Sequence, residues 1–240
     1  MTLGAVLGEA WSLYTRFFAR FVIIAAIVFA AVNAAYALLD AALYEDDLGS
    51  TESWLLLAIS VTASVVGTFW LQGAFVKAVQ DVRDGMFDSS TQEIFRAAAP
   101  VLGTLIVAGI LAGIGIGIGF LLLIVPGVVL LTWWAVIAPV IVVERKGVID
   151  AFGRSKQLVG GSFWTVLGIV LVTAILTGVA GGILTALFSF LPRFLEIFVG
   201  GTIAQAVVAP FSAIALTLTY FKLRDAKEAA ATPPATEPTA

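Results

Sequence analysis

The stretch "VLGTLIVAGILAGIGIGIGFLLLIVPGVVLLTWWAVIAPVIVV", from Val101 to Val143, contains 43 residues and not one charged side chain. A helix needs only about 20 apolar residues to cross the hydrocarbon core of a bilayer. A second uncharged run of 29 residues extends from Trp164 to Pro192. Hydrophobic residues make up 60% of the 240-residue chain and charged residues only 12%, against about 25% charge in a soluble domain. These patterns predict an all-α, polytopic membrane protein.

Six spans are predicted, each close to the length of a membrane-crossing helix. They cover residues 21–39, 54–76, 101–122, 127–143, 163–187 and 197–221. No polar loop separates the third span from the fourth, so we expect the turn within "LLLIVPGVV", where Pro126 and Gly127 would break the helix. The spans form one membrane domain, 1–224, followed by a tail, 225–240, whose Ala-, Pro- and Thr-rich composition predicts disorder.

The basic residues lie almost entirely on one side of this topology. Six spans place both termini on the same side, which then holds 12 of the 13 Lys and Arg residues and leaves only Arg193 on the other. The positive-inside rule therefore predicts a multi-pass cell-membrane protein with both termini in the cytoplasm. The first outside loop, "DAALYEDDLGSTES", is acidic and fits this orientation.

Two residue types that carry much of enzyme chemistry are missing from the sequence. The chain has no Cys and no His, so it lacks thiolate nucleophiles, the commonest general base and the commonest metal ligand. We therefore predict no catalytic, cofactor or metal site, and hence a non-enzymatic protein. A net charge of only −3 also argues against a nucleic-acid partner.

One charged stretch, "ERKGVIDAFGRSKQLVGGSF", interrupts the uncharged runs at residues 144–163. Its periodicity predicts an interfacial helix over 148–159, with the apolar side toward the acyl chains. Asp150 and Arg154 are expected to pair across one turn of this helix. The candidate lipid- or partner-binding surface comprises Glu144, Arg145, Lys146, Asp150, Arg154, Ser155 and Lys156.

Three interpretations of this charged stretch stay open. The charges could simply anchor and cap the helix, since basic residues near anionic lipid are worth about 1 kcal/mol each without any lipid specificity. They could instead bind a lipid or a membrane or cytoplasmic protein partner. In the least favoured interpretation, Glu144 and Asp150 form the carboxylate pair of a membrane enzyme.

Two other segments of the chain resemble the charged stretch. "GEAWSLYTRFFARF", "TQEIFRAAAPVLGT" and "VIDAFGRSKQLVGGSFW" each place an acid before an aromatic residue and then a base, and each leads into a span. The pattern predicts three units, each an interfacial helix followed by a two-span hairpin. Any membrane-surface helix uses these residue types, so a true repeat and a chance similarity both stay open.

The glycine-rich segment "GILAGIGIGIGF" departs from a nucleotide-binding loop, because Ile118 or Phe120 stands where the third glycine belongs. Small residues at every fourth position instead predict close helix packing. These residues are Gly109, Gly113 and Gly117 in the third span and Ala174, Gly178 and Gly182 in the fifth. The pattern predicts a compact bundle and is compatible with a homo-oligomer.

A small transporter or channel component is the alternative function. The interiors of the predicted spans contain no ionisable residue, and Asn33, Gln72 and Gln205 are their only strongly polar side chains. Transporters usually carry ionisable groups at this depth. Pro139 and Pro210 could nevertheless bend the fourth and sixth helices and free backbone carbonyls for a ligand.

Residues 126–164, "PGVVLLTWWAVIAPVIVVERKGVIDAFGRSKQLVGGSFW", resemble the membrane domain that precedes the catalytic domain in some bacterial and archaeal glycerophosphoryl diester phosphodiesterases. The residues that carry the resemblance are Pro126, Gly127, Pro139, Glu144, Ala151, Arg154, Ser155, Leu158, Gly161, Phe163 and Trp164. The chain departs from the family at Gly153 and Gly160, where basic residues are frequent, and near Thr132, where an Arg is frequent.

The catalytic domain of that family is a soluble barrel that uses His and acidic residues around a metal. This chain has no His and no room for a barrel beside its six spans. The resemblance therefore implies a membrane module without phosphodiesterase activity. We expect a scaffold, or a module that binds membrane lipid or a protein partner.

Overall fold

The computed structural model describes residues 1–45 and 51–231, and every regular element in them is a helix. Short 3₁₀ turns at Val82–Asp84 and Ala99–Val101 and a π-helical turn at Glu196–Gly200 link some of the helices. The α-helices are α1 (Leu3–Arg16), α2 (Phe18–Glu45), α3 (Thr51–Asp81), α4 (Thr91–Ala98), α5 (Leu102–Leu122), α6 (Ile124–Trp133), α7 (Ile137–Glu144), α8 (Val148–Val159), α9 (Phe163–Leu187), α10 (Arg193–Leu195) and α11 (Gly201–Ala231).

Six of the described helical segments are long and apolar enough to cross a membrane. Helices α6 and α7 together form the fourth span, and the segment from α10 to α11 forms the sixth. The segments are Phe18–Leu43, Ser53–Asp81, Thr91–Leu122, Ile124–Glu144, Phe163–Leu187 and Arg193–Ala230. The predicted all-α, six-span membrane fold is confirmed.

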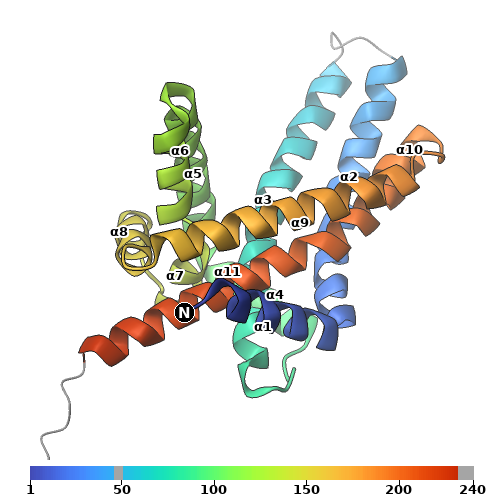
Figure 1. Cartoon of the computed structure of the whole chain (residues 1–240). Helices are drawn as coiled ribbons and strands as arrows, with labels where there is room; N and C mark the ends of the chain where they lie inside the picture. The colour runs from blue at the N-terminus through green and yellow to red at the C-terminus, as the bar shows by residue number, and fades with distance from the viewer. Residues whose placement is uncertain (46–50, 232–240) are drawn as a thin grey trace, which may run out of the picture.

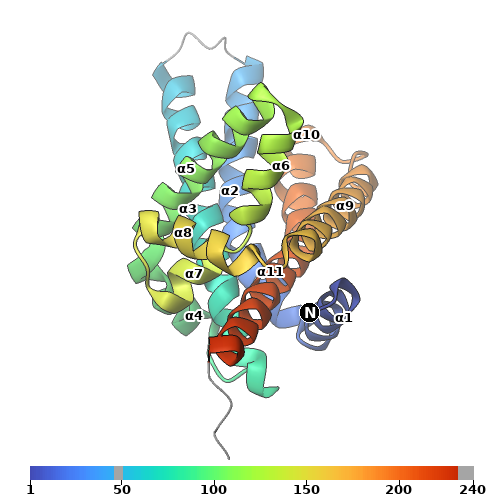
Figure 2. The same cartoon turned by 60° about the vertical axis from the view of Figure 1, so that its left-hand side comes forward.

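The spans are arranged as two hairpins joined by a crossing pair (Figure 1). Helices α2 and α3 form one long hairpin, and α5 and α6 form the other. Helix α11 packs along α9, α2 and α3, whereas α5 packs on α6 and α3. The view in Figure 2 shows the α5–α6 hairpin in front of α2, with α9 and α11 running beside it.

Three amphipathic helices each precede a span. Helix α1 packs on α11 and α9, α4 packs on α3, and α8 packs on α5, α7 and α11. Each buries one face, represented by Ala10 in α1, Ile94 in α4 and Leu158 in α8. Ser90 and Glu93 form a capping box at the start of α4. The element order thus matches the three predicted units, while a common origin of their sequences stays a prediction.

The turn between α5 and α6 lies within the predicted stretch, residues 121–129, but other residues make it. The chain reverses at Leu123, which is extended with φ −161° and ψ 152°. Pro126 is the third residue of α6, where its missing N–H costs nothing because first-turn donors have no partner within the helix. The predicted role of Pro126 and Gly127 as helix breakers is therefore wrong. The tip formed by residues 121–125 is exposed throughout.

Gly127 instead allows close packing within the hairpin. A Cβ on Gly119 would lie 2.9 Å from the Gly127 Cα, and a Cβ on Gly115 would lie 2.7 Å from the Trp134 ring. Gly109 also packs closely, against Phe69, as predicted. For the remaining predicted packing glycines, a Cβ would meet no atom within 4 Å beyond adjacent residues and the nearby backbone of its own helix; they are Gly113, Gly117, Gly178 and Gly182.

The packing prediction is therefore wrong for those four glycines within this chain. Ala174, one turn before Gly178 in α9, is exposed as well. A four-residue period defines a helix face, but it cannot say which face has a neighbour.

Pro139 and Pro210, the candidates for bending the fourth and sixth helices, have different effects. The fourth is broken at residues 134–136, three residues ahead of Pro139, so a bend near this proline is confirmed. Helix α11 continues to Ala231 despite Pro210. Residues 225–231 are thus helical where the sequence predicted disorder, because α11 extends past the bundle on exposed helix-forming residues. The rest of the tail lies outside the described residues.

Candidate functional site

The charged stretch forms a tie between three helices rather than an open site. Glu144 ends α7, and both of its carboxylate oxygens accept hydrogen bonds from Arg154 Nε of α8 at 3.0 Å. The Tyr220 hydroxyl of α11 donates to Glu144 Oε1 at 3.1 Å. Only 16% of the Glu144 side chain and 27% of the Arg154 side chain are exposed. The cluster therefore fastens α8 and α11 to the end of α7.

The partner of Arg154 is thus Glu144, ten residues earlier, and the predicted pair with Asp150 is wrong. The left-handed conformation of Arg145, with φ 55°, ends α7 and reverses the chain toward α8. This reversal brings Arg154 back over Glu144. Asp150 lies in the first turn of α8 on its exposed side, where the helix dipole favours an acid.

Ser155 is not a surface residue. Its side chain is fully buried, and its hydroxyl donates to the carbonyl oxygen of Trp133 at 2.7 Å. The Lys156 ammonium lies 4.3 Å from the centroid of the Trp133 ring. The predicted contact of the apolar α8 face with acyl chains is therefore wrong, because that face packs on the protein core.

Four residues of the predicted surface remain accessible: Arg145, Lys146, Asp150 and Lys156. Ile149 beside them is 77% exposed. In the described part of the chain, no three His, Cys, Asp or Glu side chains gather closely enough to hold a metal ion. This small mixed-charge patch lies outside the linings of the cavities described below.

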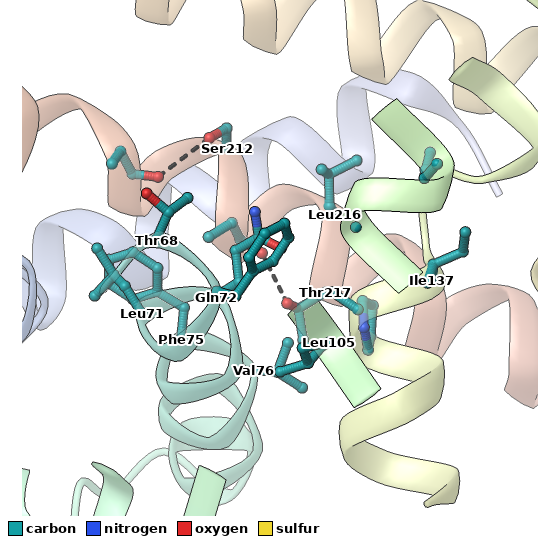
Figure 3. A pocket seen from close by; sticks show the side chains of 18 of the residues that line it. Thr68, Leu71, Gln72, Phe75, Val76, Leu105, Ile137, Ser212, Leu216 and Thr217 are labelled. Atoms are coloured by element: carbon teal, nitrogen blue, oxygen red, sulfur yellow. Dashed lines mark hydrogen bonds between the residues drawn. The ribbon is translucent and has the colours of Figure 1, made fainter. Parts of the chain in front are cut away.

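A cavity of about 500 Å³, here called the first cavity, lies between helices of the bundle (Figure 3). Its walls come from α2, α3, α5, the α6–α7 segment and α11, and they are mostly apolar. The aromatic residues among them are Phe29, Phe69, Phe75 and Trp134. The polar side chains are Thr68, Gln72, Ser212 and Thr217. Among the described lining residues none is ionisable.

The polar groups of the first cavity offer hydrogen-bonding capacity to a ligand. The Ser212 and Thr217 hydroxyls donate to carbonyls of their own helix, at 3.1 Å and 2.7 Å, which leaves oxygen lone pairs as acceptors. The Gln72 side chain lies between α3 and α11 (Figure 3). Its amide has no hydrogen-bond partner in the described chain, and an amide can both donate and accept.

The broken fourth span contributes non-helical backbone to the same wall. Trp134, Ala135 and Pro139 all line the first cavity. Proline has no N–H, so Pro139 cannot donate to the Ala135 carbonyl four residues earlier. Non-helical backbone at membrane depth occurs only where it is buried in protein or lines a cavity. The break at residues 134–136 fits that rule.

A second cavity of about 420 Å³ adjoins the first and shares Phe29 and Thr68 with it. Asn33 and Gln205 face each other there, with Gln205 Nε2 donating to Asn33 Oδ1 at 3.3 Å. Asp40 and Arg193 also line it, and both Asp40 oxygens accept hydrogen bonds from Arg193 at 3.2 Å. The second cavity is therefore more polar and carries one charge of each sign.

A stripe of polar residues on α3 connects the two cavities. Ser64 lines the second cavity, Gln72 lines the first, and Thr68 lines both. With Ser60 these residues recur every fourth position, so they lie on one helix face. Asn33, Gln72 and Gln205, the strongly polar residues predicted inside the spans, all line one of the cavities. Their polarity inside the spans could be recognised in the sequence, but the sequence does not show which helices bring them together.

No protein-family model matches the chain, no curated protein is detectably similar to it, and no solved structure matches its fold. The resemblance over residues 126–164 stays a prediction. The geometry of the two cavities therefore carries the functional argument.

Proposed function

We propose that the protein is a non-enzymatic integral membrane protein that binds a membrane amphiphile, with an apolar chain of that molecule in the first cavity. The observation that carries the proposal is this cavity of about 500 Å³. Ligand pockets typically measure roughly 300–1,000 Å³ and combine apolar and aromatic walls with a few placed polar groups. The first cavity has both properties.

The chemistry of the walls supports an apolar rather than a charged occupant. A charge placed there would lose its hydration without gaining an ionic partner, and such transfers are costly. An acyl chain would instead pack against the rings of Phe29, Phe69 and Phe75. Gln72 and the Ala135 carbonyl could satisfy a hydroxyl or ester group along the chain.

Other parts of the proposal rest on the sequence. The distribution of basic residues, 12 of 13 on one side, supports placing both termini in the cytoplasm of a cell-membrane protein. The resemblance to a phosphodiesterase membrane domain supports a module that serves a partner rather than an enzyme. The exposed patch at Arg145, Asp150 and Lys156 is the surface where such a partner would bind.

A small transporter or channel component is the second candidate. The observation that favours it is the shared wall at Phe29 and Thr68, which places the two cavities in series. A ligand that passed this wall would move along the bundle instead of staying in one place. Movement of labelled phospholipid between the leaflets of proteoliposomes would support transport over simple binding.

Photo-crosslinking of the full chain in vesicles with a phospholipid that carries a diazirine on its acyl chain tests the proposal. We expect the label on peptides that contain Phe69 and Gln72. Gly113→Leu would fill the first cavity, because Gly113 lines it and has space beside its Cα, and should reduce this labelling several-fold. The control is Gly117→Leu, one turn away, where a Cβ meets equally open space outside the cavity lining.

Equal labelling in the Gly113→Leu and Gly117→Leu variants would overturn the proposal. So would wild-type labelling confined to residues outside the cavity. Circular dichroism and size-exclusion profiles of both variants show whether each still folds, so a loss of labelling can be separated from unfolding.

A further inference from the structure

The second cavity extends from the middle of α2 and α3 toward the end of the bundle where α10 lies, away from the N-terminus (Figure 1). Asp40 stands 22 residues after the start of α2 at Phe18. At 1.5 Å per residue this distance is roughly 33 Å, close to the thickness of the hydrocarbon core. Asp40 and its partner Arg193 are therefore placed at the level of lipid headgroups, while Phe29 and Thr68 connect their cavity to the apolar first cavity.

We infer that the second cavity holds the headgroup of the same amphiphile and that this headgroup is zwitterionic, with its phosphate on Arg193 and its ammonium on Asp40. The inference rests on the proposed function, because it assigns the headgroup of a lipid whose chain occupies the first cavity. The shared wall residues make one elongated ligand sufficient for both sites.

The charges of the cavity select this class of headgroup. Its described lining holds one cation and one anion, Arg193 and Asp40. An anionic lipid would satisfy Arg193 but would place its phosphate beside an unpaired Asp40. Glu196, whose carboxylate lies 3.7 Å from Arg193, adds further repulsion toward a net negative headgroup. A zwitterion matches both lining charges and leaves neither unpaired.

The existing ion pair is easily exchanged for these contacts. The Arg193 side chain is 68% exposed and that of Asp40 36% exposed, and exposed pairs contribute only about 0–1 kcal/mol. A guanidinium binds phosphate through two parallel hydrogen bonds, as it binds a carboxylate. Tyr36 and the Asn33–Gln205 amide pair offer polar contacts for the ester region between headgroup and chain.

Native mass spectrometry of the purified full chain, equilibrated with vesicles of equal phosphatidylethanolamine and phosphatidylglycerol content, measures the selectivity. We expect wild type to retain phosphatidylethanolamine preferentially. Asp40→Asn should lower the ratio of retained phosphatidylethanolamine to phosphatidylglycerol by about fivefold, the scale of one exposed charge contact. Arg193→Gln should reduce retention of both lipids. Asp225→Asn is the control, because Asp225 pairs with Arg83 in another exposed ion pair outside both cavity linings.

A wild-type preference for phosphatidylglycerol, or a ratio that Asp40→Asn leaves equal to that of Asp225→Asn, would overturn the inference. The acyl-chain crosslink at Phe69 and Gln72 separates this result from failure of the proposed function. If the crosslink forms normally but no headgroup selectivity is found, only the headgroup assignment fails. If the crosslink is absent from the first cavity, the proposed function fails and the headgroup inference fails with it.

Discussion

Gly119 of α5 and Gly127 of α6 lie against each other with no room for a side chain on either. A Cβ on Gly119 would lie 2.9 Å from the Gly127 Cα, and a Cβ on Gly127 would lie 2.5 Å from the Phe120 ring. This contact lets two helices run back along each other after a reversal at the single residue Leu123. Small residues commonly allow such close approach of membrane helices.

We expect Gly119→Ala to destabilise the protein by about 1–3 kcal/mol, the usual cost of overpacking. The new methyl group would meet backbone, which cannot rotate away as a side chain can. Gly117→Ala in the same helix is the control, because its Cβ meets no atom within 4 Å beyond adjacent residues and the nearby backbone of α5. Thermal unfolding of both variants in detergent measures the difference, and equal midpoints would contradict the close contact.

Pro126→Ala should leave the α5–α6 hairpin intact, with a change in stability of about 0.5 kcal/mol or less. Pro126 is the third residue of α6, and a first-turn N–H has no partner within the helix whichever residue carries it. Thermal unfolding and circular dichroism test this. A large loss of helix content in Pro126→Ala would show that Pro126 is needed for the α5–α6 turn.

Glu144→Gln should destabilise the packing of α8 by about 1.5–3 kcal/mol, the value of hydrogen bonds to a charged group. The substitution removes the charge that Arg154 Nε and the Tyr220 hydroxyl both contact. Hydrogen exchange in α8, together with global unfolding, measures the effect.

Tyr220→Phe should cost less than Glu144→Gln, because it removes one hydrogen bond and keeps the ion pair. Asp150→Asn should change stability little, since Asp150 is exposed. If Asp150→Asn proved as costly as Glu144→Gln, Arg154 would depend on Asp150 after all.

Tyr14 should make the docking of α1 sensitive to alkaline pH. Its hydroxyl donates to the Val207 carbonyl of α11 at 2.7 Å, and burial raises its pKa above the ordinary tyrosine value. The folded state thus favours the protonated phenol. This contribution is fully present below the unfolded pKa of about 10 and is lost as pH rises through the higher folded pKa.

Tyr14→Phe should cost about 0.5–1.5 kcal/mol at neutral pH, the value of one hydrogen bond. The difference from wild type should begin to shrink as pH rises above about 10 and should vanish above the higher folded pKa, where both proteins lack the contact. Hydrogen exchange in α1 of wild type and Tyr14→Phe, at neutral pH and at alkaline pH, provides the measurement. A difference between the two proteins that stays constant with pH would refute this role for Tyr14.

The spans and the connecting helix α8 could be predicted from the sequence because they depend on local pattern. The helix expected over 148–159 is present with those bounds. The partner of Arg154 could not be predicted from the sequence. Asp150 lies one helical turn away, whereas Glu144 comes close to Arg154 only because the chain reverses at Arg145. The period of Gly113 and Gly117 likewise defined a face without showing whether a helix lies against it.

The cavities could not be predicted because five separate segments of the chain build the first one. Gln72 and Asn33 were conspicuous as polar residues inside spans, and polar groups at that depth usually mark function. Nothing in the sequence showed that Thr68 would line both the first cavity, beside Gln72, and the second cavity, beside Asn33. The hydroxyl stripe on α3 acquires meaning only when α2 and α11 are placed beside it.

The exposed tip of the α5–α6 hairpin, residues 121–125, has a consequence for the way this domain accommodates different bilayers. Its leucine, isoleucine and valine side chains are 69% to 86% exposed, and no charged residue occurs between Val101 and Val143. The hairpin is consequently fastened at one membrane surface only. The far end of the hairpin can change its depth in the bilayer as hydrocarbon thickness changes. This hairpin therefore avoids the mismatch energy that a helix anchored at both surfaces would incur.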